Sequence, residues 1–177
     1  KTTIASLIAS HTGRRFVSAN ASMIGVKDIR DIIDASRRHI ESGEKSTILF
    51  LDEIHRFSRS QQDVLLGDVE RGILTLIGAT TENPWYAVNA ALASRSTVFH
   101  LEVLSEEEIV RILRRAAEHD DLVRSKQPVI SEEAFNEWAR LCDGDARRAL
   151  NAMEVAILGS ADPVPVTIGR MEAAESI

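Results

Sequence analysis

The sequence has few features of secreted or membrane-bound proteins. It contains one cysteine, Cys142, which excludes a disulfide within the chain and favours a reducing cytoplasm. No run approaches the roughly 20 consecutive apolar residues that cross a membrane. Residues 1–10 do not show the charged region, apolar run and cleavage site of a secretory signal in that order. We therefore expect a soluble cytoplasmic protein with no membrane partner.

Excess positive charge is also lacking. The formal net charge is −6 at pH 7, whereas a protein that coats nucleic acid with its whole surface needs an excess of Lys and Arg. Any contact with nucleic acid must therefore be local. Short basic clusters could provide such a contact or be solvated faces, and the sequence leaves both open: Arg14 with Arg15, Arg37 with Arg38, Arg56 with Arg59, and Arg111 with Arg114 and Arg115.

The sequence does contain enough apolar residues for a core. Its 177 residues, 44% of them hydrophobic, fit one domain or a compact domain with a small appendage. Helical and strand patterns alternate up to residue 101, which predicts a parallel sheet with crossover helices. Strands are predicted at 16–20, 47–51, 73–79 and 98–101, and helices at about 4–8, 29–43 and 61–69.

The strand pattern stops after residue 104. Ser105 and Glu108 then predict a capping box at the start of an amphipathic helix. Later predicted elements are a helix from Ser131, a helix across 150–157, and a turn at Pro163 and Pro165. The sequence thus predicts an α/β domain over residues 1–104 and a small all-helical domain over 105–177.

The strongest chemical signal follows the second predicted strand, where Asp52 and Glu53 end the apolar run 48–51. Ligands of open α/β sheets bind at the carboxyl ends of strands. An Asp there can hold Mg²⁺, and the next Glu can orient an attacking water. This is the Walker B arrangement. Acidic residues also end strands without any function, and the pair alone does not decide between the two interpretations.

The chain opens with Lys1, Thr2 and Thr3 directly before the first predicted helix. A phosphate-binding loop of the pattern G-x-x-x-x-G-K-[ST] ends in this way, with the lysine on the β and γ phosphates and the hydroxyl on Mg²⁺. The glycines of that pattern are not in the sequence. We therefore expect the numbering to start inside a longer gene product, with the first strand and the Gly-rich loop missing.

Separated motifs resemble one family. They are Gly25-Val26-Lys27-Asp28-Ile29-Arg30, the run from Thr47 to Phe57, the run from Leu76 to Pro84, and Gly144-Asp145-Ala146-Arg147-Arg148-Ala149-Leu150-Asn151. In this order they resemble the bacterial replication-associated recombination protein A family (RarA or MgsA), which has a eukaryotic Werner-helicase-interacting relative. The resemblance implies an AAA+ P-loop NTPase core of the clamp-loader-like clade, followed by a helical lid.

The resemblance also implies ATP and Mg²⁺ as cofactors. It makes Lys1 the Walker A lysine, with Thr2 and Thr3 beside it in the nucleotide site. Thr2 and Asp52 become the Mg²⁺ ligands, and Glu53 becomes the base that activates water.

The resemblance assigns roles to further residues. Thr80 matches sensor 1, although a threonine at a strand end can instead make a local turn bond. Arg95 matches the arginine finger offered to the nucleotide of the next subunit, for which a guanidinium suits developing phosphoryl charge. Arg147 matches sensor 2, with Arg148 as the competing assignment. Asn20 matches a polar switch that holds Glu53 inactive until a ligand binds.

Three side chains have weaker interpretations. Trp85 could stack on a base or pack against a subunit, but an aromatic after a proline turn is more often a local packing anchor. His55 has no His or Cys partner at ligand spacing, so it predicts no metal site. Cys142 is expected in the core of the helical domain.

By resemblance, the expected function is that of a DNA-dependent ATPase in replication-fork maintenance, recombination and DNA repair, with hydrolysis at a subunit interface. The implied partners are single-stranded DNA, duplex ends or forks, single-stranded-DNA-binding protein, and copies of the same chain in a tetramer. A nucleoid-associated place in a bacterial cytoplasm is implied as well. A clamp-loader subunit, a Holliday-junction branch-migration motor and a non-catalytic scaffold are the alternatives. Without its central strand, the chain is expected to be inactive alone.

Overall fold

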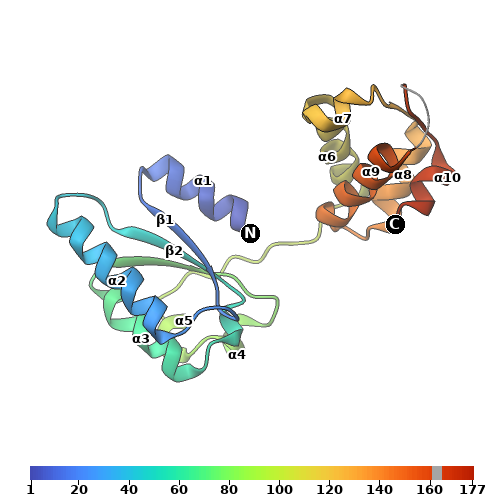
Figure 1. Ribbon diagram of the computed structural model, residues 1–177. Coiled ribbons are helices and arrows are strands. Elements are labelled where there is room, and N and C mark those ends of the chain that lie inside the picture. Colours follow the sequence, from blue (N-terminus) through green and yellow to red (C-terminus); the bar gives the residue numbers. More distant parts are fainter. Residues whose placement is uncertain (161–164) are drawn as a thin grey trace. The chain divides into compact units, whose positions relative to one another are not determined.

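The computed structural model describes residues 1–160 and 165–177, and the chain forms two compact units, residues 1–99 and 100–177 (Figure 1). Of the predicted turn, Pro163 lies outside the described residues. No helix in the described ranges is long and apolar enough to cross a membrane.

The first unit is built on three parallel strands in the order β1-β2-β3. They are β1 (Phe16–Asn20), β2 (Thr47–Asp52) and β3 (Leu74–Gly78). The central strand β2 is buried from Thr47 to Leu51, as its continuous apolar run predicted. Register places Asn20 beside Asp52 and Leu51 beside Gly78, so the carboxyl ends of the strands lie together. The predicted parallel sheet with crossover helices is confirmed.

Helices cover both faces of this sheet (Figure 1). On one face, Leu49 and Leu51 pack with Ile29 and Ile33 of α2 (Val26–Glu41) and with α3 (Arg59–Glu70). On the other face, Phe50 packs with Ala5 of α1 (Thr2–Thr12). Successive residues of β2 therefore enter opposite cores, which is why the strand is apolar at every position. The remaining elements of the unit are the 3₁₀ turn η1 (Ile54–Arg56), α4 (Pro84–Ala87) and α5 (Ala90–Ala93).

An ion pair connects the two helices on one face. Arg37 of α2 donates to Asp68 of α3 at 2.7 Å, and Arg71 donates to the same oxygen at 2.9 Å. Burial by itself would raise the pKa of Asp68, but the hydrogen bonds from the two arginines outweigh it and lower the pKa below its ordinary value.

The prediction of a strand at 98–101 is wrong. These residues belong to no strand of the described structure, and Phe99 is 81% exposed. A strand exists only where a neighbour satisfies its backbone groups. Among the described residues, β3 pairs with β2 alone, so no neighbouring strand receives this run.

The second unit is mainly helical. It contains α6 (Glu106–His119), α7 (Asp121–Ser125), α8 (Glu132–Leu141), α9 (Ala146–Gly159) and α10 (Arg170–Glu175). Their apolar faces enclose Trp138, Leu113 and Met153, and Cys142 is buried with them as predicted. The predicted capping box is present: Ser105 Oγ accepts from Glu108 N, and Glu108 Oε2 accepts from Ser105 N.

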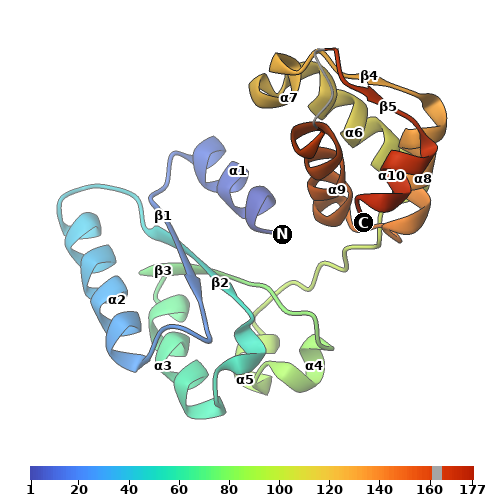
Figure 2. The same ribbon diagram turned by 45° about the vertical axis from the view of Figure 1, so that its right-hand side comes forward.

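The sequence did not predict a short parallel pairing in this unit. Figure 2 shows β4 (Val129–Ile130) beside β5 (Thr167–Ile168). Two backbone bonds continue the pairing, from Val129 N to Val166 O and from Ser131 N to Ile168 O. The pairing connects the segment before α8 to the segment before α10, so it adds a minimal sheet to a helical unit.

Candidate active site

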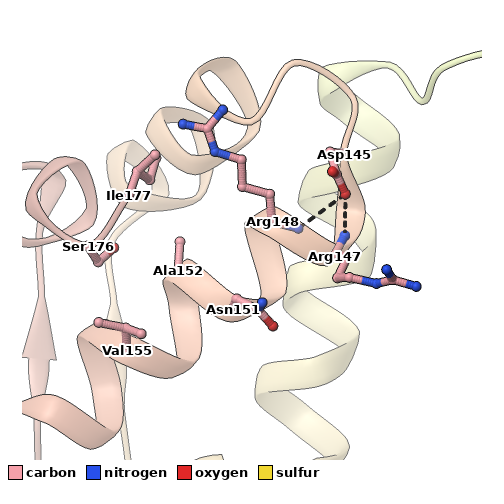
Figure 3. A pocket seen from close by; sticks show the side chains of 8 residues that line it. All are labelled: Asp145, Arg147, Arg148, Asn151, Ala152, Val155, Ser176 and Ile177. Atoms are coloured by element: carbon pink, nitrogen blue, oxygen red, sulfur yellow. Dashed lines mark hydrogen bonds between the residues drawn. The ribbon is translucent and has the colours of Figure 1, made fainter.

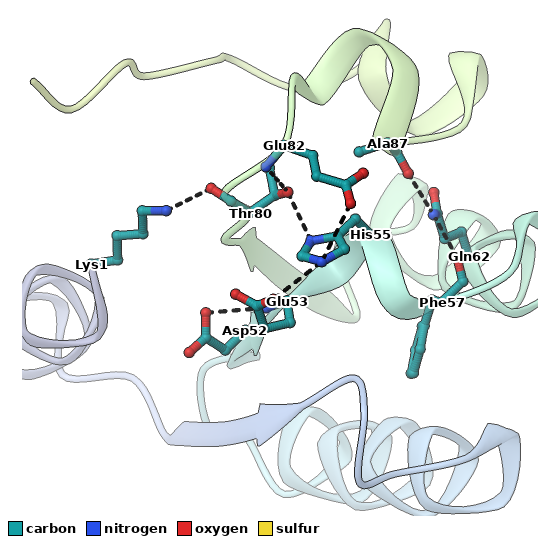
Figure 4. Close-up of polar contacts among 9 residues, drawn as sticks. All are labelled: Lys1, Asp52, Glu53, His55, Phe57, Gln62, Thr80, Glu82 and Ala87. Atoms are coloured by element: carbon teal, nitrogen blue, oxygen red, sulfur yellow. Dashed lines mark hydrogen bonds and ion pairs between the residues drawn. The ribbon is translucent and has the colours of Figure 1, made fainter.

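The polar side chains of the first unit gather where its three strands end. Asn20 and Asp52 end β1 and β2, and register makes them neighbours, while Thr80 lies two residues beyond the end of β3. Figure 4 shows Lys1, Asp52, Glu53 and Thr80 over the same end of the sheet. Parallel strands place their carboxyl ends on one edge, which is where α/β sheets bind ligands.

Glu53 leaves β2 in a strained conformation. Its φ of 55° lies in the left-handed region, which a residue other than glycine adopts at a cost of roughly 1–2 kcal/mol. Asp52 Oδ1 accepts from Glu53 N at 3.1 Å, and Ile54 N donates to Ala79 O at 3.0 Å. These contacts on either side of Glu53 hold the turn, which aims the glutamate away from the strand direction.

The Glu53 carboxylate lies against the His55 imidazole. His55 Nε2 lies 3.1 Å from Glu53 Oε2, and His55 Nδ1 lies 2.9 Å from Thr80 Oγ1 (Figure 4). The imidazole is 5% exposed, and Glu82 Oε1 lies 3.8 Å from Nε2. The histidine therefore connects the predicted base to the predicted sensor residue.

Thr80 makes both a local and a long-range contact. Its hydroxyl accepts from Glu82 N at 2.9 Å, which is the local turn bond that the sequence left open. The same hydroxyl contacts His55, 25 residues away. Thr80 thus belongs to the group of polar side chains around Glu53 while still closing its own turn.

Lys1 lies at this edge too. Its ammonium donates to Thr80 O at 2.5 Å. Thr2 and Thr3 are exposed in the first turn of α1. The hydroxyl of Thr2 and the carboxylate of Asp52 are hard oxygen ligands of the kind that Mg²⁺ takes while keeping several waters, so their chemistry fits this ion.

Asn20 is bonded locally. Its side-chain oxygen accepts from Ser22 N at 2.8 Å, and Ala21 N donates to Asp52 O at 2.9 Å. Within the described residues, the Glu53 carboxylate contacts His55, whereas the Asn20 side chain accepts from Ser22 N. The switch role of Asn20 stays a prediction.

Arg95 is held within its own unit. It follows α5, and its Nε lies 2.5 Å from Glu70 Oε1 at the end of α3. It also donates to Ala91 O at 3.0 Å. The side chain is 48% exposed, so the guanidinium remains accessible to another molecule.

The second unit carries Arg147 and Arg148 in the first turn of α9. Asp145 caps this helix by accepting from both backbone amides, at 2.9 and 3.2 Å. Both arginines line a hollow of about 280 Å³ between α9 and the chain end at Ser176 and Ile177. Figure 3 shows their guanidinium groups pointing in different directions, so the two side chains face different parts of the surface.

Arginines of several basic clusters make contacts within the chain. Arg37 pairs with Asp68, Arg114 pairs with Glu132, and Arg14 donates to Ser46 at 2.6 Å. The Arg114 guanidinium also lies 5.0 Å from the centre of the Phe135 ring. These contacts favour a structural role for much of the local positive charge.

Trp85 is not a packing anchor, because 64% of the residue is exposed.

Sequence reasoning missed the contacts of His55, because it considered this residue only as a metal ligand. The signal was its position two residues after Glu53: η1 begins at Ile54, and its tight turn brings the imidazole back to the glutamate. Glu70 was missed as well, because its contact with Arg95 joins distant parts of the sequence.

A protein-family model matches all of the first unit and the start of the second. Residues 1–106 match the model of the ATPase family associated with various cellular activities (AAA).

Curated proteins match more of the chain. The ATPase WRNIP1 of Dictyostelium discoideum is 44% identical over 157 residues, which are 89% of this chain and 18% of that protein. Replication-associated recombination protein A of Escherichia coli K12 is 43% identical over 156 residues, 88% of this chain and 35% of that protein. These names are those that the sequence motifs predicted. The chain spans about a third or less of the length of these relatives.

Solved structures share the fold. The RuvB Holliday junction branch migration motor of Thermotoga maritima superimposes with a TM-score of 0.75 at 22% identity, over 99% of this chain and 56% of that chain. A mutant form of the same protein gives a TM-score of 0.77 at 21% identity, with the same coverage. At this identity the likeness concerns the fold alone.

Proposed function

The chain belongs to the AAA family of ATPases, and from this premise we propose that it hydrolyses ATP as the motor part of a DNA-dependent protein of replication-associated recombination and repair. The observation that carries the proposal is the group Asp52, Glu53 and Thr80 at the carboxyl ends of neighbouring strands, with Lys1 at the same edge. The names of the similar proteins support the setting in recombination.

The residues divide the work of phosphoryl transfer. Lys1 binds and neutralises the β and γ phosphates, and Thr3 lies beside it in the nucleotide site. Thr2 and Asp52 would hold Mg²⁺, which supplies positive charge to the phosphate oxygens when bound. Glu53 orients and deprotonates the attacking water. Thr80 contacts the γ-phosphate or this water.

Completion of the site across a subunit boundary is part of the proposal. Arg95 is a permanently charged fork donor on the surface of its unit, suited to the phosphoryl group bound by a neighbouring copy. Arg147 is proposed as the contact that the helical unit makes with nucleotide, with Arg148 as its competitor. We also propose a homo-oligomer, a tetramer by resemblance, that binds forked or single-stranded DNA and single-stranded-DNA-binding protein in a bacterial cytoplasm at the nucleoid.

The proposal is tested by ATP turnover of the complete protein that carries this sequence, with and without forked DNA. Glu53→Gln should lower kcat at least about 100-fold while nucleotide still binds, because the amide cannot take a proton. Arg95→Ala should lower kcat about 1,000-fold or more. Arg124→Ala is the matched control, since Arg124 is an exposed arginine outside the site, 3.8 Å from Asp121.

The outcomes separate the parts of the proposal. Turnover that survives Glu53→Gln contradicts the assigned base. Turnover that survives Arg95→Ala contradicts hydrolysis across a boundary. An ATPase that DNA does not stimulate contradicts the role at replication forks. The clamp-loader and branch-migration alternatives share the fold, and no contact in the described residues favours either.

A further inference from the structure

Both ring nitrogens of His55 are engaged by residues of the candidate site. Nε2 lies 3.1 Å from Glu53 Oε2 and Nδ1 lies 2.9 Å from Thr80 Oγ1. The imidazole is 5% exposed, so its contacts are shielded from competing water. A buried histidine with two such partners can adopt few other orientations.

For a neutral His55, the chemistry of its two partners assigns the proton positions. An ionised carboxylate can only accept, so the nitrogen that faces Glu53 carries the hydrogen. In a neutral ring the other nitrogen then accepts, and Thr80 donates its hydroxyl hydrogen to Nδ1. The Thr80 oxygen in turn accepts from Glu82 N at 2.9 Å. With a neutral ring, the three contacts run in one direction, from Glu82 N through Thr80 and His55 to Glu53.

We propose that His55 is a positioning residue that couples Thr80 to the orientation of the Glu53 carboxylate. The inference rests on the proposed ATPase function and goes one step beyond it. Glu53 meets His55 through Oε2, which assigns the other oxygen, Oε1, to the attacking water. His55 thereby fixes the rotation of a carboxylate whose backbone is already held in the left-handed region.

The coupling follows from the single hydrogen of the Thr80 hydroxyl. Thr80 cannot donate this hydrogen to His55 Nδ1 and to a phosphate oxygen at the same time. A change of partner at Thr80 therefore alters the bond at Nδ1, and His55 carries the change to Glu53. A nucleotide contact made by Thr80 after β3 therefore changes the orientation of the Glu53 carboxylate after β2.

Two amide substitutions separate the two bonds of the ring. His55→Gln places an amide donor near the position of Nε2 and can keep the contact with Glu53. His55→Asn places an amide oxygen near the position of Nδ1 and can keep the contact with Thr80. The control is His39→Ala, because His39 also has both ring nitrogens engaged, with Arg15 at 2.6 Å and Glu44 at 3.0 Å, and lies away from the strand ends that carry the site.

The measurement is steady-state ATP turnover and ATP binding by the complete protein. His55→Ala should lower kcat about 10- to 100-fold, the scale of a misplaced reacting group, while the Kd for ATP changes less than about 3-fold. His55→Gln should recover most of kcat and His55→Asn should not. His39→Ala should leave kcat unchanged. Equal recovery by Gln and Asn, or a loss confined to the Kd for ATP, overturns the proposal.

A double-mutant cycle tests the coupling itself. Thr80→Val removes the hydroxyl and keeps the shape of the side chain. If Thr80 acts through His55, kcat of the double variant with His55→Ala should fall little below that of the worse single variant. Losses that multiply independently overturn the coupling. Where His55→Ala does not fold by circular dichroism, the comparison of Gln with Asn decides.

Failure of this inference is distinguishable from failure of the proposed function. A protein without ATP turnover, or one whose turnover survives Glu53→Gln, refutes the ATPase assignment. A protein that loses turnover with Glu53→Gln and keeps it with His55→Ala refutes only the role of His55.

Discussion

Replacement of Gly144 by alanine should selectively weaken the second unit. Gly144 has a φ of +76°, and a Cβ built there would lie 2.8 Å from Leu104 O and 3.1 Å from Val103 Cβ. The left-handed backbone costs an L-residue roughly 1–2 kcal/mol. Overlap with fixed backbone adds about 1–3 kcal/mol. We therefore expect Gly144→Ala to lower the free energy of unfolding by about 2–5 kcal/mol, a large part of the roughly 5–15 kcal/mol that stabilises a domain.

The assay is hydrogen exchange of peptides from α8 and α9 in the complete protein, which reports the opening free energy of this unit. The control is Gly159→Ala at the end of α9, where the added Cβ meets nothing within 4 Å and the φ is not positive. This control should be neutral or slightly stabilising, because alanine favours a helix. If both variants lower protection equally, the steric argument for the glycine of the Gly144-Asp145-Ala146-Arg147 motif is wrong.

The remaining predictions concern a cap, an ion pair and a core. Asp145→Ala should destabilise α9 by about 0.5–2 kcal/mol, measured by the same exchange assay, because two amides lose their acceptor. Asp68 has a lowered pKa in the folded state, so its stabilising contribution is present above its unfolded pKa and is lost as pH falls through the folded pKa. The free energy of unfolding, measured against pH, should therefore change less below about pH 4 for Asp68→Asn than for wild type. Leu65→Ala, at a fully buried position, should cost about 2–5 kcal/mol in denaturant unfolding of the first unit.

The regular elements were predictable because their signals are local. The strand 16–20 matches β1 at both ends, and 47–51 lies within one residue of β2. The capping box of Ser105 and Glu108 was readable from its spacing and is present. The strand prediction for 98–101 was wrong because apolar residues indicate a tendency to be buried, whereas a strand also needs a hydrogen-bonded neighbour.

Short elements escaped because each is held by a single cap or by a distant contact. Asn83 accepts from Trp85 N and Asn89 accepts from Leu92 N, which start α4 and α5. Single turns of this kind have no hydrophobic period to recognise. The pairing of β4 with β5 joins residues far apart in sequence, so no local pattern could reveal it.

In the site, the sequence predicted which polar side chains stand at the strand ends and missed how these side chains contact one another. Asp52 ends β2 and Thr80 lies just beyond β3, and these strands are neighbours in a parallel sheet, so both residues lie at one edge. The contact between His55 and Glu53 instead accompanies the φ of 55° at Glu53, which no local propensity of glutamate favours.

That conformation bears on why an acid stands at position 53. A glycine would adopt a φ of 55° at little cost, so stability of the turn does not explain the glutamate. The strain is held in place by contacts around it: Asp52 accepts from its backbone amide, Ile54 is bonded to Ala79, and His55 meets its carboxylate. Strained residues that several contacts determine are found at functional sites. The surrounding contacts therefore hold a glutamate at this position for its carboxylate, and not for the stability of the turn.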